Sequence, residues 1–337
     1  KGPLGKWASQ AEGYFVFPKL EGELGPRMQF QGKNILNWSL NDYLGLANHP
    51  EVRKADTEAA MQYGAAYPMG ARMMSGHTKY HEQLENELAA FVMKESAYLL
   101  NFGYQGMVSI IDALVTKNDI IVYDVDSHAC IIDGVRLHMG KRFTYKHNDL
   151  ESMEKNLQRA TKMATETGGG ILFITEGVFG MRGQQGKLKE IVAMKEKYNF
   201  RLLVDDAHGF GVLGQAGRGS LAHFGLPNAG RLIYMGTLGK AAGVSGAFVA
   251  ASETVIEWLI NRARSYIFTT GSSPLIACAL LASLELIENG DARRAHLQAL
   301  IRQLRDGLAG TRWRLLASPT AIQPVIIGDN HETLRVS

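Results

Sequence analysis

Short apolar runs alternate with longer amphipathic stretches through the middle of the chain. Each run is brief enough for one buried strand and is followed by glycine or a polar residue that ends it. The predicted strands cover residues 97–101, 120–123, 142–146, 171–175, 201–205, 232–235 and 246–251. Helices are predicted between them, at 107–115, 150–167 and 187–198. This alternation predicts an α/β fold with a large, mostly parallel sheet and helices on both faces.

The flanking regions have a different pattern. Before the alternating region we predict a strand at 34–38, a helix at 50–63, a glycine- and methionine-rich loop at 64–79 and a helix at 80–91. After it we predict helices at 253–264, 274–288 and 292–308 and strands at 313–316 and 322–327. The order of elements then favours an N-terminal segment (1–45), a large domain (46–265) and a small α+β C-terminal domain (266–337). Because the chain halts soon after a strand, we expect the small domain to be truncated.

Two polar pairs are interpreted as structural. His81 and Glu85 lie four residues apart on the predicted helix 80–91, and without a third ligand a surface pair is favoured over a metal site. Asn148 and Asp149 precede Leu150, which is typical of a helix cap.

Composition excludes several classes of protein. The 337 residues carry a net charge of +3 and no basic run with interleaved aromatic residues, so a nucleic-acid partner is not expected. Cys130 and Cys278 form neither a metal-type spacing nor a disulfide framework, and a cytoplasmic location is expected. The longest apolar run, 274–284, is too short to span a membrane, and the first residues lack the apolar core of a signal peptide.

One lysine occupies an unusual position. Lys240 follows the apolar run Leu232–Met235 and lies among Gly236, Gly239 and Gly243, just before the next apolar run. A lysine in a tight turn between core strands would lose solvation, which makes its amine more nucleophilic. Taken alone, this stretch favours an ordinary surface lysine. The strand that ends at Asp205 reverses that preference, because a strand-end aspartate and a turn lysine together are what pyridoxal phosphate enzymes need.

Other polar groups follow the predicted strands. They are Gly103 with Tyr104, His128, Glu176, Asp205 with His208, and Thr237 with Lys240. The carboxyl ends of parallel strands meet at one edge, so we expect these groups to share one crevice. The stretch Gly209–Gly214 matches G-x-G-x-x-G, but acids and a histidine separate it from the strand and no helix follows, so a dinucleotide site is not favoured.

Seven motifs together resemble the α-oxoamine synthases, which are pyridoxal phosphate enzymes of fold type I. They are Asn41-Asp-Tyr-Leu-Gly-Leu46, Asp126-Ser-His-Ala129, His147-Asn-Asp149, Thr175-Glu-Gly-Val-Phe179, Val204-Asp-Asp-Ala-His-Gly-Phe-Gly211, Gly217-Arg-Gly219 and Gly236-Thr-Leu-Gly-Lys240. The resemblance covers nearly all of the chain. It implies condensation of an amino acid with an acyl-CoA, with loss of CO2 and free CoA, by a homodimer with shared active sites.

The resemblance also implies a role for each site residue. Lys240 would bond to the cofactor aldehyde and act as the base, Asp205 would hold the pyridinium nitrogen, His208 would contact the ring hydroxyl and His128 would stack on the ring, with Glu176 in the same cofactor site. The amides of Gly103 and Tyr104 with Thr237 would hold the phosphate, Thr269 or Thr270 would reach the phosphate of the neighbouring subunit, and Asn41 would orient the substrate carboxylate.

Within the family the two halves of the chain differ. The first 210 residues or so look more like serine palmitoyltransferase-like members, whereas the later part looks most like 8-amino-7-oxononanoate synthase, which joins L-alanine to a pimeloyl thioester in biotin biosynthesis. We expect the latter activity, with serine palmitoyltransferase or glycine C-acetyltransferase as alternatives. An aminotransferase is a more distant alternative, followed by a dehydrogenase and a non-catalytic partner subunit.

The chain departs from the family pattern in two places. Where the family usually has Ser-Met-Asp-Gly, this chain has Gly180-Met181-Arg182-Gly183, which removes a hydroxyl and replaces an acid with a base. The family's carboxylate-binding arginine lies in a C-terminal stretch that is not in this sequence.

Overall fold

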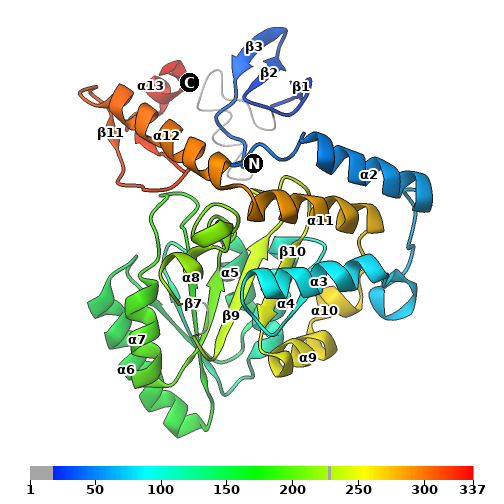
Figure 1. Ribbon diagram of the computed structural model, residues 1–337. Helices are drawn as coiled ribbons and strands as arrows, with labels where there is room; N and C mark the ends of the chain where they lie inside the picture. Colours follow the sequence, from blue (N-terminus) through cyan, green and yellow to red (C-terminus); the bar gives the residue numbers. More distant parts are fainter. Residues whose placement is uncertain (1–17, 227–228, 337) are drawn as a thin grey trace.

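Seven strands form one sheet in the computed structural model of the chain, which describes residues 18–226 and 229–336 (Figure 1). In their order across the sheet the strands are β4 (Ser96–Leu100), β10 (Ala247–Ala251), β9 (Leu232–Thr237), β8 (Arg201–Asp205), β7 (Ile171–Glu176), β5 (Ile120–Asp124) and β6 (Lys141–Tyr145). From β9 to β6 all neighbours are parallel, whereas β10 is antiparallel to both β4 and β9. The predicted mostly parallel sheet is confirmed.

Helices cover both faces of this sheet (Figure 1). One face carries α4 (Gly103–Leu114), α5 (Ala129–Leu137), α9 (Glu253–Arg262) and α10 (Arg264–Ile267). The other carries α3 (Lys79–Phe91), α6 (Leu150–Thr167), α7 (Leu188–Tyr198) and α11 (Pro274–Glu288). Strand side chains alternate between the two apolar cores, as shown by Leu203 on the first face and Leu202 and Val204 on the second. The continuous apolar runs in the sequence follow from this double burial.

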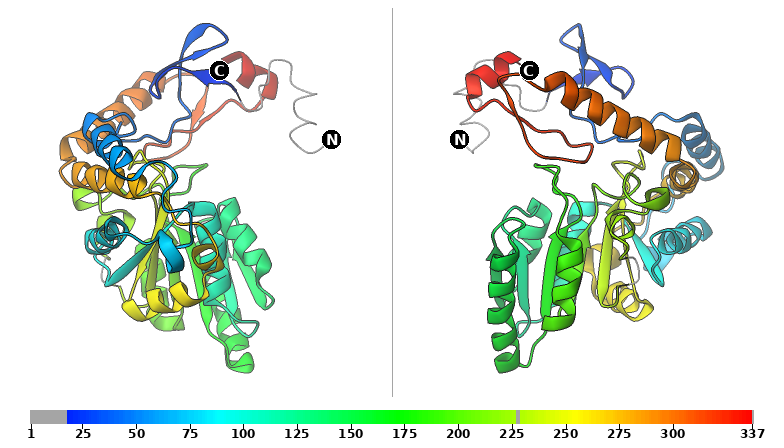
Figure 2. Two further views of the ribbon diagram at one scale, coloured as in Figure 1. Left: turned by 90° about the vertical axis from the view of Figure 1, so that its right-hand side faces the viewer. Right: turned by 60° about the vertical axis from the view of Figure 1, so that its left-hand side comes forward.

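The remaining elements lie outside the large sheet and the helices named above, and most of them gather at one end of the sheet (Figure 2). They are β1 (Leu20–Glu21), β2 (Arg27–Phe30), β3 (Lys33–Leu36), α2 (Pro50–Tyr63), the short helices η1 (Arg72–Gly76), η2 (Gln215–Gly217) and α8 (Ser220–His223), and α12 (Asp291–Leu308), β11 (Arg314–Leu315), β12 (Val325–Ile326) and α13 (Asn330–Val336). Helix α2 packs along α11. Residues 1–17 of the predicted N-terminal segment lie outside the described residues. Among the helices of residues 18–226 and 229–336, none has both the length and the apolar character to cross a membrane.

Several local predictions differ from the structure. The predicted helix 253–264 is interrupted at Ala263, and the predicted loop 64–79 contains the π-helical turn η1. The two C-terminal strands shorten to two residues each, because they pair only with each other. Asp149 caps α6 by accepting a hydrogen bond from the Ser152 amide at 2.7 Å, as the cap pattern indicated.

The interpretation of His81 and Glu85 as a surface pair is wrong. His81 is fully buried, and its Nε2 lies 2.9 Å from the Ser272 carbonyl oxygen. Glu85 forms an ion pair with Arg72 at 2.5 Å and accepts the Leu99 amide at 2.7 Å. Segments distant in sequence cover this side of α3, so helical spacing alone did not reveal its burial.

Candidate active site

A cavity of about 200 Å³ lies at the carboxyl ends of the parallel strands. Its walls come from the ends of five strands and from the helices that follow them, and they hold nearly all of the polar groups expected there. The lining residues are Gly103, Tyr104, His128, Cys130, Glu176, Asp205, Ala207, His208, Met235, Gly236, Thr237 and Lys240. The structure therefore brings together residues that are far apart in sequence, because parallel strands present their carboxyl ends at one edge.

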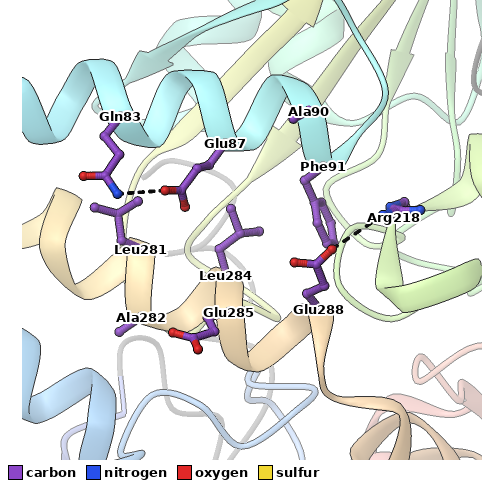
Figure 3. Close-up of a pocket in the computed structure, with 10 residues that line it drawn as sticks. All are labelled: Gln83, Glu87, Ala90, Phe91, Arg218, Leu281, Ala282, Leu284, Glu285 and Glu288. Atoms are coloured by element: carbon purple, nitrogen blue, oxygen red, sulfur yellow. Dashed lines mark hydrogen bonds and ion pairs between the residues drawn. The ribbon is translucent and has the colours of Figure 1, made fainter.

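A larger groove lies between α3 and α11 but lacks this chemistry (Figure 3). Its volume is about 660 Å³. Four of its polar side chains already form pairs, Gln83 with Glu87 at 2.8 Å and Arg218 with Glu288 at 3.5 Å. Chemistry rather than size thus identifies the smaller cavity as the candidate active site.

The turn that carries Lys240 is closed by its own backbone. The Leu238 amide donates to the Gly246 carbonyl and the Gly243 amide to the Lys240 carbonyl, each at 2.9 Å. Gly243 has a φ of +67°, and any β carbon there would run into the backbone of Ala47. Glycine at 243 is therefore required for the turn to pack, and the packed turn holds Lys240 at the cavity.

Three side chains form a hydrogen-bonded row beside the cavity. Lys240 Nζ lies 2.8 Å from His208 Nε2, and the Tyr43 hydroxyl lies 2.6 Å from His208 Nδ1. Burial, together with the charge of Lys240, lowers the pKa of His208 to about 3, so the imidazole is neutral. Burial also lowers the pKa of Lys240, although Asp205 and Glu176 partly oppose this. A neutral imidazole thus faces an amine whose pKa is lowered by burial.

Two carboxyl groups stand side by side at the ends of β7 and β8. Glu176 is in register with Asp205. Burial raises the pKa of Asp205, while the Ala207 amide donates to its Oδ1 at 3.0 Å. Burial and the neighbouring charge of Asp205 raise the pKa of Glu176 to about 8, and Glu176 Oε1 accepts the His128 amide at 2.6 Å. At neutral pH one proton on Glu176 therefore relieves the repulsion between the two groups.

The neighbouring acid, Asp206, has a structural role. It is fully buried and accepts hydrogen bonds from the Ser220 amide at 2.7 Å, the Ser220 hydroxyl at 2.5 Å and the Tyr234 hydroxyl at 2.8 Å. Of the two acids that end this strand, only Asp205 lines the cavity.

The first turn of α4 forms another wall. Gly103 begins this helix, and its N-cap residue Phe102 makes no side-chain capping bond. The first amides of α4 are consequently free to bind an anion. A β carbon at Gly103 would lie 3.4 Å from Thr237 Oγ1, so the helix start and the threonine hydroxyl are adjacent. Tyr104 donates its hydroxyl to Asp133 and contributes its ring edge-on to His128, with centroids 6.3 Å apart.

The other expected residues lie outside the cavity wall. Asn41 accepts a hydrogen bond from Tyr43 at 3.3 Å and so joins the row that reaches Lys240. Thr270 pairs with Ala71 in an isolated bridge, and its carbonyl accepts from Asn101 at 2.7 Å. Thr269 precedes it in the segment between α10 and α11. Neither threonine lines the cavity.

Sequence reasoning missed Tyr43 and Cys130 as site residues. Tyr43 belongs to a motif that was noticed, but only its contact with His208 indicates its place. Cys130 Sγ lies 3.0 Å from His128 Nδ1, and burial raises the pKa of this thiol well above its usual range. The sequence feature that could have indicated Cys130 as a site residue was its position two residues after His128.

This set of donors fits pyridoxal phosphate. The free amides at the start of α4 suit a phosphate group. Asp205 suits a protonated ring nitrogen, His128 offers an exposed imidazole beside the cavity, and the Lys240 amine suits an aldehyde.

Comparison with known proteins agrees with this reading. The model of the family "Aminotransferase class I and II" matches residues 33–336. The chain is 61% identical, over 97% of its length and 78% of the relative's, to a cysteate-C-fatty acyltransferase of Capnocytophaga ochracea. It is 47% identical, over 94% of its length and 81% of the relative's, to an 8-amino-7-oxononanoate synthase of Herminiimonas arsenicoxydans.

The fold comparison gives the same result. A serine palmitoyltransferase structure from Sphingomonas wittichii superposes with a TM-score of 0.91 at 29% identity, covering 99% of this chain and 84% of that one. One assignment is supported by the fold match, by the family match across most of the chain and by the acyltransferase relatives. The chain therefore belongs to the class I and II aminotransferase family and, within it, to the α-oxoamine synthases, which are pyridoxal phosphate-dependent acyltransferases.

Proposed function

We propose that this enzyme joins cysteate, an amino acid with a sulfonate side chain, to a fatty acyl group delivered as a thioester. The observation that carries this choice of substrates is the 61% identity to the Capnocytophaga ochracea cysteate-C-fatty acyltransferase across 97% of the chain. A bond forms between the α carbon of the amino acid and the acyl carbonyl carbon, the thiol leaves, and the amino-acid carboxylate departs as CO2.

Lys240 removes the proton from the α carbon in this proposal. Bound pyridoxal phosphate supplies the electron sink that makes this proton acidic. Burial lowers the pKa of Lys240, which increases the fraction of free amine near neutral pH. His208, neutral and 2.8 Å away, accepts a hydrogen bond from the Lys240 amine and orients it.

Asp205 holds the ring nitrogen in its protonated form. Its carboxyl is buried, and the Ala207 amide fixes one of its oxygens. Burial and the neighbouring Asp205 raise the pKa of Glu176 to about 8, so Glu176 keeps its proton at neutral pH and adds no second negative charge beside Asp205. Asp205 would then be the acceptor for a pyridinium N–H when the cofactor is bound.

The remaining sequence-derived roles extend this proposal. Asn41 orients the substrate carboxylate, and Thr269 or Thr270 reaches the phosphate bound by a second copy of the chain in a homodimer. Exposed apolar side chains near Thr270 support such an interface, because Phe102, Met73 and Phe268 are 59%, 70% and 69% exposed.

A second candidate is 8-amino-7-oxononanoate synthase, which uses L-alanine and a pimeloyl thioester. The 47% identity to the Herminiimonas arsenicoxydans enzyme favours it. The two candidates differ in the charge of the amino-acid side chain and in the charge at the far end of the acyl chain.

A substrate matrix separates the two. The enzyme loaded with pyridoxal phosphate is incubated with cysteate, alanine, serine or glycine, each with acyl-CoAs of graded length and with pimeloyl-CoA. Free thiol is followed by its absorbance after derivatisation, and products are identified by mass. We expect the highest kcat/KM for cysteate with a long acyl chain. A maximum for alanine with pimeloyl-CoA would replace this proposal with the second candidate.

A further inference from the structure

The turn after β7 differs from the usual family pattern at two positions and lies against the active site. The Gly183 amide donates to the Phe179 carbonyl at 2.8 Å, which closes the turn. Its far side is held by Ser318 and Thr320, whose hydroxyls both donate to the Gly183 carbonyl at 3.0 Å. The turn is therefore a fixed part of the site's surroundings.

Gly180 brings this turn to the row of catalytic side chains. A β carbon at Gly180 would lie 2.7 Å from His208 Nε2. That nitrogen is the one that lies 2.8 Å from Lys240 Nζ. The turn thus lies next to the space in which a molecule would react with the Lys240 amine.

Arg182 extends from the same turn, and part of its guanidinium group is free to donate hydrogen bonds to another molecule. Its Nε donates to Asp126 Oδ2 at 2.6 Å, and its side chain is 46% exposed. Within residues 18–226 and 229–336, its two terminal nitrogens have no hydrogen-bond acceptor. Asp126 lies two residues before His128, so this contact links the turn after β7 to the segment after β5. One carboxylate orients the guanidinium group and leaves two N–H₂ groups for another anion.

From this arrangement, which rests on the proposed function, we infer that Arg182 binds the anionic side chain of the amino-acid substrate and selects a sulfonate over an uncharged side chain. A sulfonate offers several acceptor oxygens, and a planar guanidinium group can donate two parallel hydrogen bonds to it. A carboxylate at this position would repel the same substrate. Glycine at 180 allows this turn to approach His208 closely, because even a β carbon there would lie 2.7 Å from His208 Nε2.

Substrate binding tests this inference apart from turnover. The enzymes loaded with pyridoxal phosphate are the native chain, Arg182→Gln, Arg182→Lys and the control Arg231→Gln. Arg231 is a suitable control because it is similarly exposed, at 42%, and pairs with Glu196, but it precedes β9 at the end opposite Thr237. Cysteate and alanine are titrated against each, and the Kd is read from the change in cofactor absorbance.

We expect Arg182→Gln to lower the preference for cysteate over alanine by about 10- to 100-fold, the range for one charged hydrogen-bonded contact. Arg182→Lys should retain part of the preference, and Arg231→Gln should retain all of it. Added salt should weaken cysteate binding to the native enzyme more than to Arg182→Gln. An unchanged ratio of the two Kd values in Arg182→Gln would overturn the inference.

Thiol release separates this inference from the proposed function. If the native enzyme releases no thiol with cysteate and any acyl-CoA, the proposed function fails. The ratio of Kd values still decides the role of Arg182, because binding is measured without the acyl donor.

Discussion

Replacing Gly180 with alanine tests whether the row of side chains from Tyr43 through His208 to Lys240 matters for catalysis. The added β carbon would lie 2.7 Å from His208 Nε2, against 3.4 Å for the near limit of ordinary contact. His208 cannot simply retreat, because the Tyr43 hydroxyl holds its other nitrogen at 2.6 Å. The ring must therefore move by several tenths of an ångström, and the 2.8 Å contact with Lys240 should break.

The size of the effect follows from that one contact. Loss of one hydrogen bond costs about 1 kcal/mol, so kcat/KM should fall by about fivefold. The assay is initial-rate thiol release with the preferred substrate pair. Gly239→Ala is the matched control, because it lies next to Lys240 but a β carbon there would meet nothing within 4 Å.

A double-mutant cycle makes the test specific. In a His208→Ala background, Gly180→Ala should cost little further activity, because the atom it displaces has been removed. Equal losses from Gly180→Ala with and without His208, or full activity of the single variant, would refute the reasoning.

Three further predictions concern the buried ionisable groups. Lys240→Ala should abolish both thiol release and the visible absorbance of the lysine-bound cofactor, and a variant that still turns over would contradict the assignment. Because burial raises the pKa of Glu176 from 4.5 to about 8, the folded cofactor-free protein keeps a proton that the unfolded chain loses, and stability should fall as pH rises from about 4.5 to 8. In Glu176→Gln this fall in melting temperature should be smaller, whereas an identical pH profile would argue against a raised pKa. Asp206→Ala should lower the free energy of unfolding by about 2–4 kcal/mol in urea titrations, because Ser220 and Tyr234 lose a buried acceptor; a change below about 0.5 kcal/mol would count against a structural role.

The regular α/β order was readable in the sequence because most of the strands there are buried on both faces. Short apolar runs such as 171–174 and 202–204 favour buried strands when helical patterns separate them. The parallel pairing then places the residue after each run at the same edge. For this reason the sequence alone indicated that Asp205, His208 and Lys240 would lie near one another, and the structure does bring them to one cavity.

Other features depended on contacts between distant segments. Asp205 and Asp206 are adjacent in sequence, but only the positions of Ser220 and Tyr234 show that one faces the cavity and the other stabilises the fold. His81 has the spacing of a surface residue, yet the chain near Ser272 buries it.

What the sequence determined by itself was the succession of strands and helices and the residues that end each strand, since both depend on local patterns of apolar and polar side chains. What only the tertiary structure decided was which of these groups touch: Tyr43 with His208, Arg182 with Asp126, and Gly180 against His208. Such contacts join segments whose separation along the chain leaves no periodic signal, so they exist only once the sheet has assembled and packed.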